Sequence, residues 1–146
     1  MKKPVILIVD DEKNAREGLA RALQKTYDVL LADNGQRALD ILAEKPVDVV
    51  LSDVRMPAMD GLTLLQRALA RTPQPLCIML TAYGSIEQAV EAMRRGAYDF
   101  MTKPINLDQL ELVLQRALRT RELEMENRQL HEQLDDIGHG QLRWVT

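Results

Sequence analysis

The sequence has few of the residues on which several classes of protein depend. Its single cysteine cannot form an intrachain disulfide, which excludes a disulfide-stabilised fold and suits a reducing compartment. Aromatic residues make up only 3% of the chain, so we expect an aliphatic core without the aromatic surfaces that stack on single-stranded nucleic acid. The formal net charge of -3 also disfavours binding to a phosphate backbone, and we expect no direct nucleic acid binding by this segment.

Long hydrophobic runs are absent as well. No run approaches the roughly 20 apolar residues that a membrane-spanning helix needs. The apolar run Val5–Val9 follows a basic start, but it is too short for a signal peptide and acidic residues follow it at once. We therefore expect a cytoplasmic protein without a membrane segment.

The residues that are present suit one globular domain. The chain has 146 residues, of which 46% are hydrophobic and 28% are charged, as in ordinary globular proteins with a single packed core. Five short apolar runs alternate with segments of helical periodicity. The runs are Val5–Val9, Val29–Ala32, Val47–Leu51, Leu76–Leu80 and the weaker Tyr98–Met101.

This alternation predicts the fold class. Continuous apolarity is typical of strands buried on both faces, and strict alternation with helices predicts right-handed crossovers between parallel strands. We predict an α/β fold: a doubly wound five-stranded parallel sheet with the flavodoxin-like strand order 2-1-3-4-5. Ser85 is expected to begin the helix after the fourth run, with Glu87 and Gln88 in its first turn, and Gly96 to end it.

The last helical segment is longer than the sheet requires. Its periodicity continues without glycine or proline from about residue 106 to residue 136, so we expect an extended C-terminal helix whose first half packs and whose second half protrudes. The protruding half has an apolar seam at alternating four- and three-residue spacing, which predicts a short coiled coil, whereas the alternative is a solvated helix without a partner. The seam residues are Leu123, Asn127, Leu130, Leu134 and Ile137. We expect a domain at residues 1–120, a helical coiled-coil linker at 121–137, and a tail at 138–146 that leads to an absent output domain.

Acidic residues follow two of the predicted strands. Asp10 and Asp11 follow the first strand and Asp53 follows the third, and these two strands are neighbours at the point where such sheets bind ligands. Three crowded carboxylates would raise one another's pKa unless a cation neutralised them, and hard oxygen ligands suit Mg²⁺. Any one of these residues alone could equally be a helix cap, but together at one crevice they predict a metal site.

A hydroxyl and an ammonium group follow the last two strands. Thr81 follows the fourth strand and Lys103 follows the fifth, so both are expected at the rim that carries the carboxylates. Each alone would be an ordinary cap or a solvated charge. Together the groups supply a nucleophile, a metal, a hydrogen-bond donor and a fixed positive charge, which is what transfer of a phosphoryl group requires.

These residues resemble the receiver domain of bacterial two-component response regulators, from about residue 3 to residue 118. The matching motifs are Val9-Asp10-Asp11-Glu12, Asp53-Val54-Arg55-Met56-Pro57-Ala58-Met59-Asp60-Gly61, Thr81-Ala82 and Lys103-Pro104, in the family's order. The resemblance implies that Asp53 accepts a phosphoryl group from a sensor histidine kinase. It also implies that the protein is a switch and not a turnover enzyme.

The resemblance also assigns roles to the surrounding residues. Asp11 would bind Mg²⁺ directly, Asp10 mainly through water, and the main-chain carbonyl of Arg55 would supply a further ligand beside Asp53. Thr81 and Lys103 would contact the phosphoryl group. The family further implies a rotamer switch at Phe100 that acts together with Thr81, a turn before the third helix at Gly61, and a cis peptide bond between Lys103 and Pro104.

Two segments resemble the NtrC subfamily of receivers, namely residues 83–100 and the helical linker at 119–130. That resemblance implies a sigma-54-dependent transcription activator. Separately, because the seam residues have no sheet to cover, we expect a homodimer formed through the fourth helix, the fifth strand and the C-terminal helix. A receiver that controls an enzymatic output, such as a cyclic-di-GMP phosphodiesterase, is an alternative.

A phosphatase of the haloacid-dehalogenase kind is disfavoured because Arg55 stands where that family has a second aspartate. A flavodoxin-like cofactor carrier is disfavoured because Asp10 and Asp11 would repel a flavin phosphate.

Overall fold

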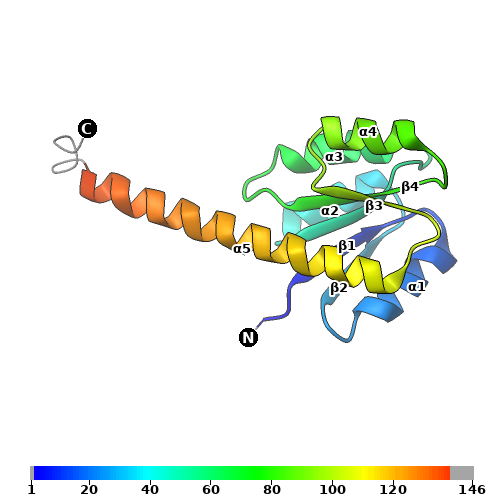
Figure 1. Ribbon diagram of the computed structural model, residues 1–146, viewed down its shortest axis with the longest axis horizontal. Helices are drawn as coiled ribbons and strands as arrows, with labels where there is room; N and C mark the ends of the chain where they lie inside the picture. Colours follow the sequence, from blue (N-terminus) through cyan, green and yellow to red (C-terminus); the bar gives the residue numbers. More distant parts are fainter. Residues whose placement is uncertain (1, 139–146) are drawn as a thin grey trace.

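The computed structural model describes the backbone of residues 2–138 and the side chains of residues 2–131. Five parallel strands form one sheet in the order β2-β1-β3-β4-β5, which confirms the predicted flavodoxin-like fold (Figure 1). The strands are β1 (Val5–Val9), β2 (Asp28–Ala32), β3 (Val49–Asp53), β4 (Leu76–Thr81) and β5 (Asp99–Thr102). The helices are α1 (Lys13–Leu23), α2 (Gly35–Glu44), α3 (Gly61–Leu69), α4 (Ile86–Arg94) and α5 (Leu107–Gly138). No helix in the described part of the chain is both long and apolar enough to cross a membrane.

Each face of the sheet has its own hydrophobic core, because successive side chains of a strand point to opposite faces. In β1, Leu7 and Val9 pack toward α2, α3 and α4, whereas Ile6 and Ile8 pack toward α1 and α5. All four side chains are fully buried. This arrangement explains why the strands are apolar throughout instead of alternating between apolar and polar residues.

The strands continue beyond the apolar runs that predict them. The prediction ended the third strand at Leu51, but in β3 the pairing with β4 continues through Ser52 to Asp53. Likewise β4 includes Thr81. Periodicity missed these ends because the terminal residues are polar although they are buried. Asp53 and Thr81 therefore belong to the rigid sheet itself and not to the loops that follow it.

Helix α5 is a long rod of which only the first half is docked (Figure 1). Leu110, Leu114 and Ala117 are fully buried against the sheet, while residues 122–131 are all exposed. Leu123 and Leu130 of the predicted seam are among the exposed residues. The side chains of the last two seam residues and the whole segment 139–146 lie outside the described residues. The division into segments 1–120, 121–137 and 138–146 stays a prediction.

Candidate functional site

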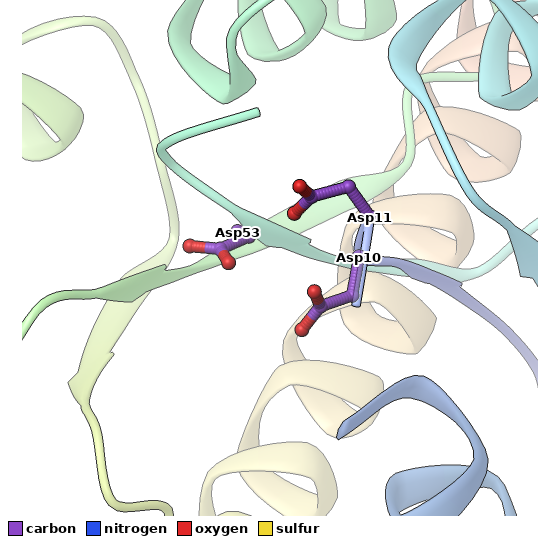
Figure 2. Close-up of side chains that lie close together, drawn as sticks. All are labelled: Asp10, Asp11 and Asp53. Atoms are coloured by element: carbon purple, nitrogen blue, oxygen red, sulfur yellow. The ribbon is translucent and has the colours of Figure 1, made fainter. Parts of the chain in front are cut away.

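Three carboxylates meet at the carboxyl edge of the sheet. Asp10 and Asp11 follow β1, and Asp53 is the last residue of β3, the strand that pairs with β1. One carboxylate oxygen from each residue lies within 4.8 Å of the other two (Figure 2). The adjacency of β1 and β3 thus brings together residues that are more than forty positions apart in the sequence.

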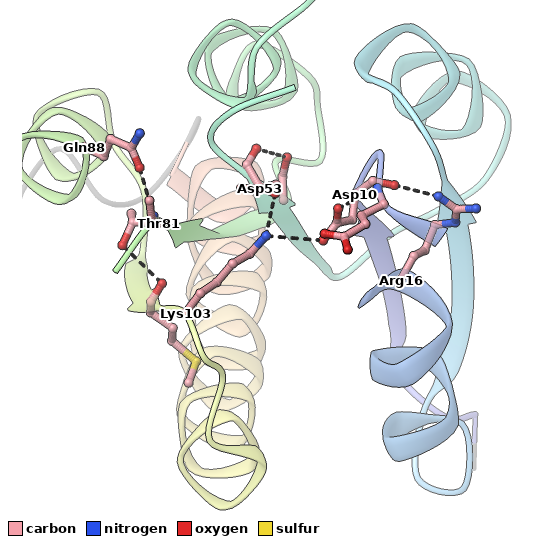
Figure 3. A network of polar contacts seen from close by, with 10 residues as sticks. Asp10, Arg16, Asp53, Thr81, Gln88 and Lys103 are labelled. Carbon is pink, nitrogen blue, oxygen red and sulfur yellow. Dashed lines mark hydrogen bonds and ion pairs between the residues drawn. The ribbon is translucent and has the colours of Figure 1, made fainter. Parts of the chain in front are cut away.

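Lys103 lies between two of these carboxylates. Its Nζ donates a hydrogen bond to Asp53 Oδ2 at 2.6 Å and lies 3.7 Å from Asp10 Oδ2 (Figure 3). The peptide bond to Pro104 is cis, as the sequence resemblance implied. Partial burial lowers the pKa of Lys103, but the hydrogen bond to Asp53 and the charges of Asp53, Asp10 and Glu12 together outweigh burial, so its pKa is raised overall. The ammonium group therefore stays charged beside Asp53.

Asp10 has one oxygen without a hydrogen-bond donor. Its Oδ1 accepts from the backbone N–H of Glu12 at 2.9 Å, but its Oδ2 is buried and has no hydrogen-bond partner. Burial is the main reason that the pKa of Asp10 is raised above its ordinary value, although Glu12 and Lys103 act in the opposite direction. An orphaned carboxylate oxygen beside two further carboxylates fits a hard divalent cation such as Mg²⁺.

Thr81 is fully buried at the end of β4, next to β3. Its hydroxyl donates to the main-chain carbonyl oxygen of Met101 at 3.3 Å, so in this structure it is directed at β5 (Figure 3). The backbone N–H of Lys103 donates to the Thr81 carbonyl at 2.9 Å. Thr81 is therefore joined to the strand that carries Phe100 and to the residue that contacts Asp53.

Phe100 is 37% exposed on β5 and lines a hollow of about 540 Å³ between α4 and β5. Ala89, Val90 and Met93 of α4 form the apolar side of the same hollow. In the structure the ring is only partly buried, and the hollow beside it is large enough to take an aromatic side chain.

The role of Gly61, which follows the loop after β3, differs from the turn that the sequence predicts there. The residue with a left-handed backbone in this loop is Ala58, whose φ is 65°. Gly61 instead begins α3 and donates its N–H to the carbonyl of Val54 at 2.7 Å. A Cβ atom at Gly61 would lie 2.0 Å from the carbonyl oxygen of Asp53. The glycine therefore allows α3 to approach the backbone of Asp53.

Sequence reasoning missed two residues that support the site. Arg16 donates from Nη1 to the carbonyl of Asp10 at 2.8 Å, and no sequence pattern indicates this contact. Gln88 accepts the backbone N–H of Ala82 at 3.0 Å (Figure 3). The predicted cap at Ser85 gave a partial signal, because a glutamine three residues after a capping serine reaches back toward the loop. It reaches Ala82 because the N–H of Ser85 already donates to the Ala82 carbonyl.

Comparison with known proteins links this geometry to one family. The family model described as the response regulator receiver domain matches residues 6–115. The chain is 44% identical to the regulatory protein AtoC of Escherichia coli K12 over 130 residues, which cover 88% of this chain and 28% of AtoC. It therefore spans less than a third of the length of that curated relative.

Solved structures show the same relationship. NtrX of Brucella abortus in complex with ADP matches with a TM-score of 0.83 at 36% identity, over 88% of this chain and 30% of that chain. The signal receiver domain of an HD domain-containing protein from Pseudomonas fluorescens Pf-5 matches with a TM-score of 0.78 at 32% identity, over 83% and 98% of the two chains.

Proposed function

The chain belongs to the response regulator receiver domain family, and on this premise we propose that it is a switch in which Asp53 accepts a phosphoryl group from a sensor histidine kinase. Receiver domains are signalling switches and not turnover enzymes. The observation that supports the proposal best is the position of the Asp53 carboxylate, 2.6 Å from Lys103 Nζ and beside Asp10 and Asp11. Within the described residues, Asp10, Asp11 and Asp53 are the one group of three side chains suited to hold a metal ion.

In the proposed reaction a carboxylate oxygen of Asp53 attacks the phosphorus atom of a phosphohistidine. The new O–P bond forms as the P–N bond breaks, and the electron pair of that bond returns to the imidazole nitrogen. Lys103, held charged beside Asp53, offsets negative charge on the phosphoryl oxygens. The hydroxyl of Thr81 would leave the Met101 carbonyl and donate to a phosphoryl oxygen instead.

Receiver domains bind Mg²⁺ at an acidic cluster, which here consists of Asp10, Asp11 and Asp53. We propose Asp11 as a direct ligand, Asp10 as a ligand mainly through water, and the main-chain carbonyl of Arg55 as a further ligand. When bound, the ion would neutralise charge on the carboxylates and on the transferred group. Metal titration of Asp11→Ala and Asp10→Ala tests the ranking, because the Asp11 variant should lose more affinity; equal affinities would remove the distinction.

Phosphorylation of the purified chain tests the central proposal. Incubation with acetyl phosphate and Mg²⁺ should add one phosphoryl group to the wild type, detected by intact mass, and none to Asp53→Asn. Asp28→Asn is the matched control, because Asp28 is an exposed aspartate at the opposite edge of the sheet and should leave the adduct unchanged. An undiminished adduct on Asp53→Asn would overturn the proposal.

We propose that the phosphorylated state is read on the α4–β5–α5 surface, defined here by exposed Ile86, Val90, Met93 and Phe100 and the facing part of α5. When Thr81 turns toward the phosphoryl group, the space near Met101 changes and the Phe100 ring can move into the hollow beside α4. Amide exchange with a phosphoryl mimic should change at residues 84–96 and around Phe100. Changes confined to α1 and α2 would contradict this mechanism.

We further propose a homodimer formed through this surface and the exposed half of α5. Leu123 and Leu130 are exposed on that half, and Asn127 occupies a seam position that fixes register in two-stranded coils. The acidic residues of the segment oppose association, so the helix alone should associate weakly. Asn127→Leu should tighten the dimer in analytical ultracentrifugation, and Leu130→Asp should weaken it. Monomers at every concentration, in wild type and in Asn127→Leu, would contradict the proposal.

The relatives suggest what the switch controls. Their receivers belong to NtrC-like regulators, so we propose a sigma-54-dependent transcription activator as the output and the cytoplasm as its location. The receiver of the HD domain-containing protein supports the second candidate, an enzymatic output. The gene sequence beyond Thr146 distinguishes the two, since an ATPase that interacts with sigma-54 would support the first candidate and an HD domain would support the second.

A further inference from the structure

Among the α5 side chains that the structure describes, which end at residue 131, the last buried one is charged. Leu110, Leu114 and Ala117 form the buried stripe of the helix, and Arg121 continues that stripe four residues later with only 7% of its surface exposed. From residue 122 to residue 131 every side chain is exposed. The docked part of α5 therefore ends at an arginine and not at an apolar residue.

Arg121 contacts the amino edge of the sheet, opposite the phosphorylation site. Its Nη1 lies 3.2 Å from Asp48 Oδ1, and its Nη2 donates to the carbonyl of Val47 at 3.5 Å. Nη1 also contacts the sulfur of Met125 one turn further along α5. The guanidinium thus joins the residues just before β3 to the turn of α5 at which the exposed rod begins.

Asp48 makes three further hydrogen bonds, to two other strands of the sheet. Its Oδ2 accepts the backbone N–H of Val5 at 2.8 Å, and its own N–H donates to the Val5 carbonyl at 2.9 Å. Its carbonyl accepts the N–H of Leu76 at the start of β4. The contacts of Asp48 with β1 and β4 therefore do not depend on Arg121, and they fix the position of its carboxylate.

We propose that the Asp48–Arg121 pair is a clamp that ends the docked part of α5 and fixes the axis along which the exposed helix leaves the domain. A planar guanidinium held by several acceptors has a defined orientation, which an apolar side chain at this position would lack. The clamp anchors the rod to the residues just before β3, which β1 and β4 hold in place, and not to the α4–β5–α5 surface. The clamp does not require phosphorylation of Asp53. The clamp proposal can therefore be disproved while the proposed function holds, and the proposed function can be disproved while the clamp proposal holds.

Hydrogen exchange on the full chain tests the clamp. The amides of residues 118–125 should exchange about tenfold faster in Asp48→Asn and in Arg121→Met than in the wild type. The asparagine oxygen can still accept the Val5 N–H, so its effect reports on the lost charge. Arg119→Met is the matched control, because Arg119 is an exposed arginine on the same helix and should leave exchange unchanged. The double variant should exchange no faster than the faster single variant, because both changes remove the same contact.

Distance measurement tests the direction of the rod. Nitroxide labels at Lys45→Cys and Glu126→Cys, both exposed positions, report the distance between the sheet edge and the rod, since the native Cys77 is buried. Mixing with unlabelled chain leaves only intrachain distances. Arg121→Met should broaden the distance distribution roughly twofold, and Arg119→Met should not broaden it. Equal exchange rates or equal distance widths in the Arg121 and Arg119 variants would overturn the proposal.

Discussion

The two edges of the sheet carry similar charged groups, but their carboxylates differ in how many hydrogen-bond and ion-pair partners they have. At the amino edge, both oxygens of Asp48 have partners, the N–H of Val5 and the guanidinium of Arg121, although the buried Nε of Arg121 has no hydrogen-bond partner. At the carboxyl edge, three carboxylates lie together with one lysine, and Asp10 Oδ2 has no hydrogen-bond partner. The Asp48 carboxylate is fully paired and suits a structural role, whereas a carboxylate oxygen without a donor, beside two further carboxylates, suits a cation-binding site.

The carboxyl edge also depends on a close backbone approach, between Gly61 and Asp53. Gly61→Ala should give the largest effect, because its Cβ would overlap the Asp53 carbonyl, and we expect the free energy of unfolding to fall by more than about 3 kcal/mol. Gly18→Ala is the control, since nothing lies within 4 Å of a Cβ at that helical position. It should stabilise the protein by roughly 0.5 to 1 kcal/mol. Urea denaturation measures both changes, and equal stability of the two variants would refute the close approach.

Removal of charge at the amino edge should destabilise the protein. Asp48→Asn leaves the buried Arg121 without its ion pair, and because Asp48 is partly exposed we expect a loss of about 1 to 2 kcal/mol. Mg²⁺ should not alter the loss. Asp28→Asn, an exposed aspartate at the same edge, should change the stability by less than about 0.5 kcal/mol. If the two variants have the same stability, the amino edge is not a satisfied pair.

The same substitution at the carboxyl edge should have the opposite sign. Asp10→Asn removes a buried charge of which one oxygen, Oδ2, has no hydrogen-bond donor, so without divalent metal it should stabilise the protein by about 1 kcal/mol at neutral pH. The raised pKa of Asp10 sets the pH dependence: the stability is fully present below the ordinary pKa of 3.8 and is lost as the pH rises through the folded-state pKa. The advantage of the variant should therefore vanish below about pH 4.

Denaturation over a pH series, with and without Mg²⁺, checks this prediction. Mg²⁺ should stabilise the wild type more than Asp10→Asn and so reduce or reverse the difference between them. If Asp10→Asn destabilises the protein at neutral pH without metal, the carboxyl edge is a structural network like the amino edge.

The core between the two edges should be closed to reagents. Burial raises the pKa of the Cys77 thiol to about 12, so almost no thiolate exists near neutral pH. A thiol reagent should label the folded wild type about a thousandfold more slowly than it labels an exposed cysteine in Lys45→Cys, and denaturant should remove the difference. Rapid labelling of Cys77 in the folded protein would mean that the amino end of β4 opens locally.

Local patterns in the sequence determined the strands, their order and the residues that meet at the carboxyl edge. Continuous apolar runs and strict alternation with helices limit the topology to a few parallel arrangements. Once β1 and β3 are neighbours, Asp10, Asp11 and Asp53 must meet, because each follows or ends one of these strands. This convergence needs only the chain order and the parallel direction of the strands.

The tertiary structure alone decided which charges are satisfied. The sequence pattern around Arg121 is that of a solvated residue in a polar helix. Arg121 is nevertheless buried, because the direction of the helix axis places it against Asp48, 73 positions earlier in the chain. The sequence predicts a turn at Gly61, but in the structure a Cβ atom at this position would overlap the carbonyl oxygen of Asp53. Hydrogen bonds and desolvation depend on atoms brought together from distant segments, and periodicity in one segment carries no information about them.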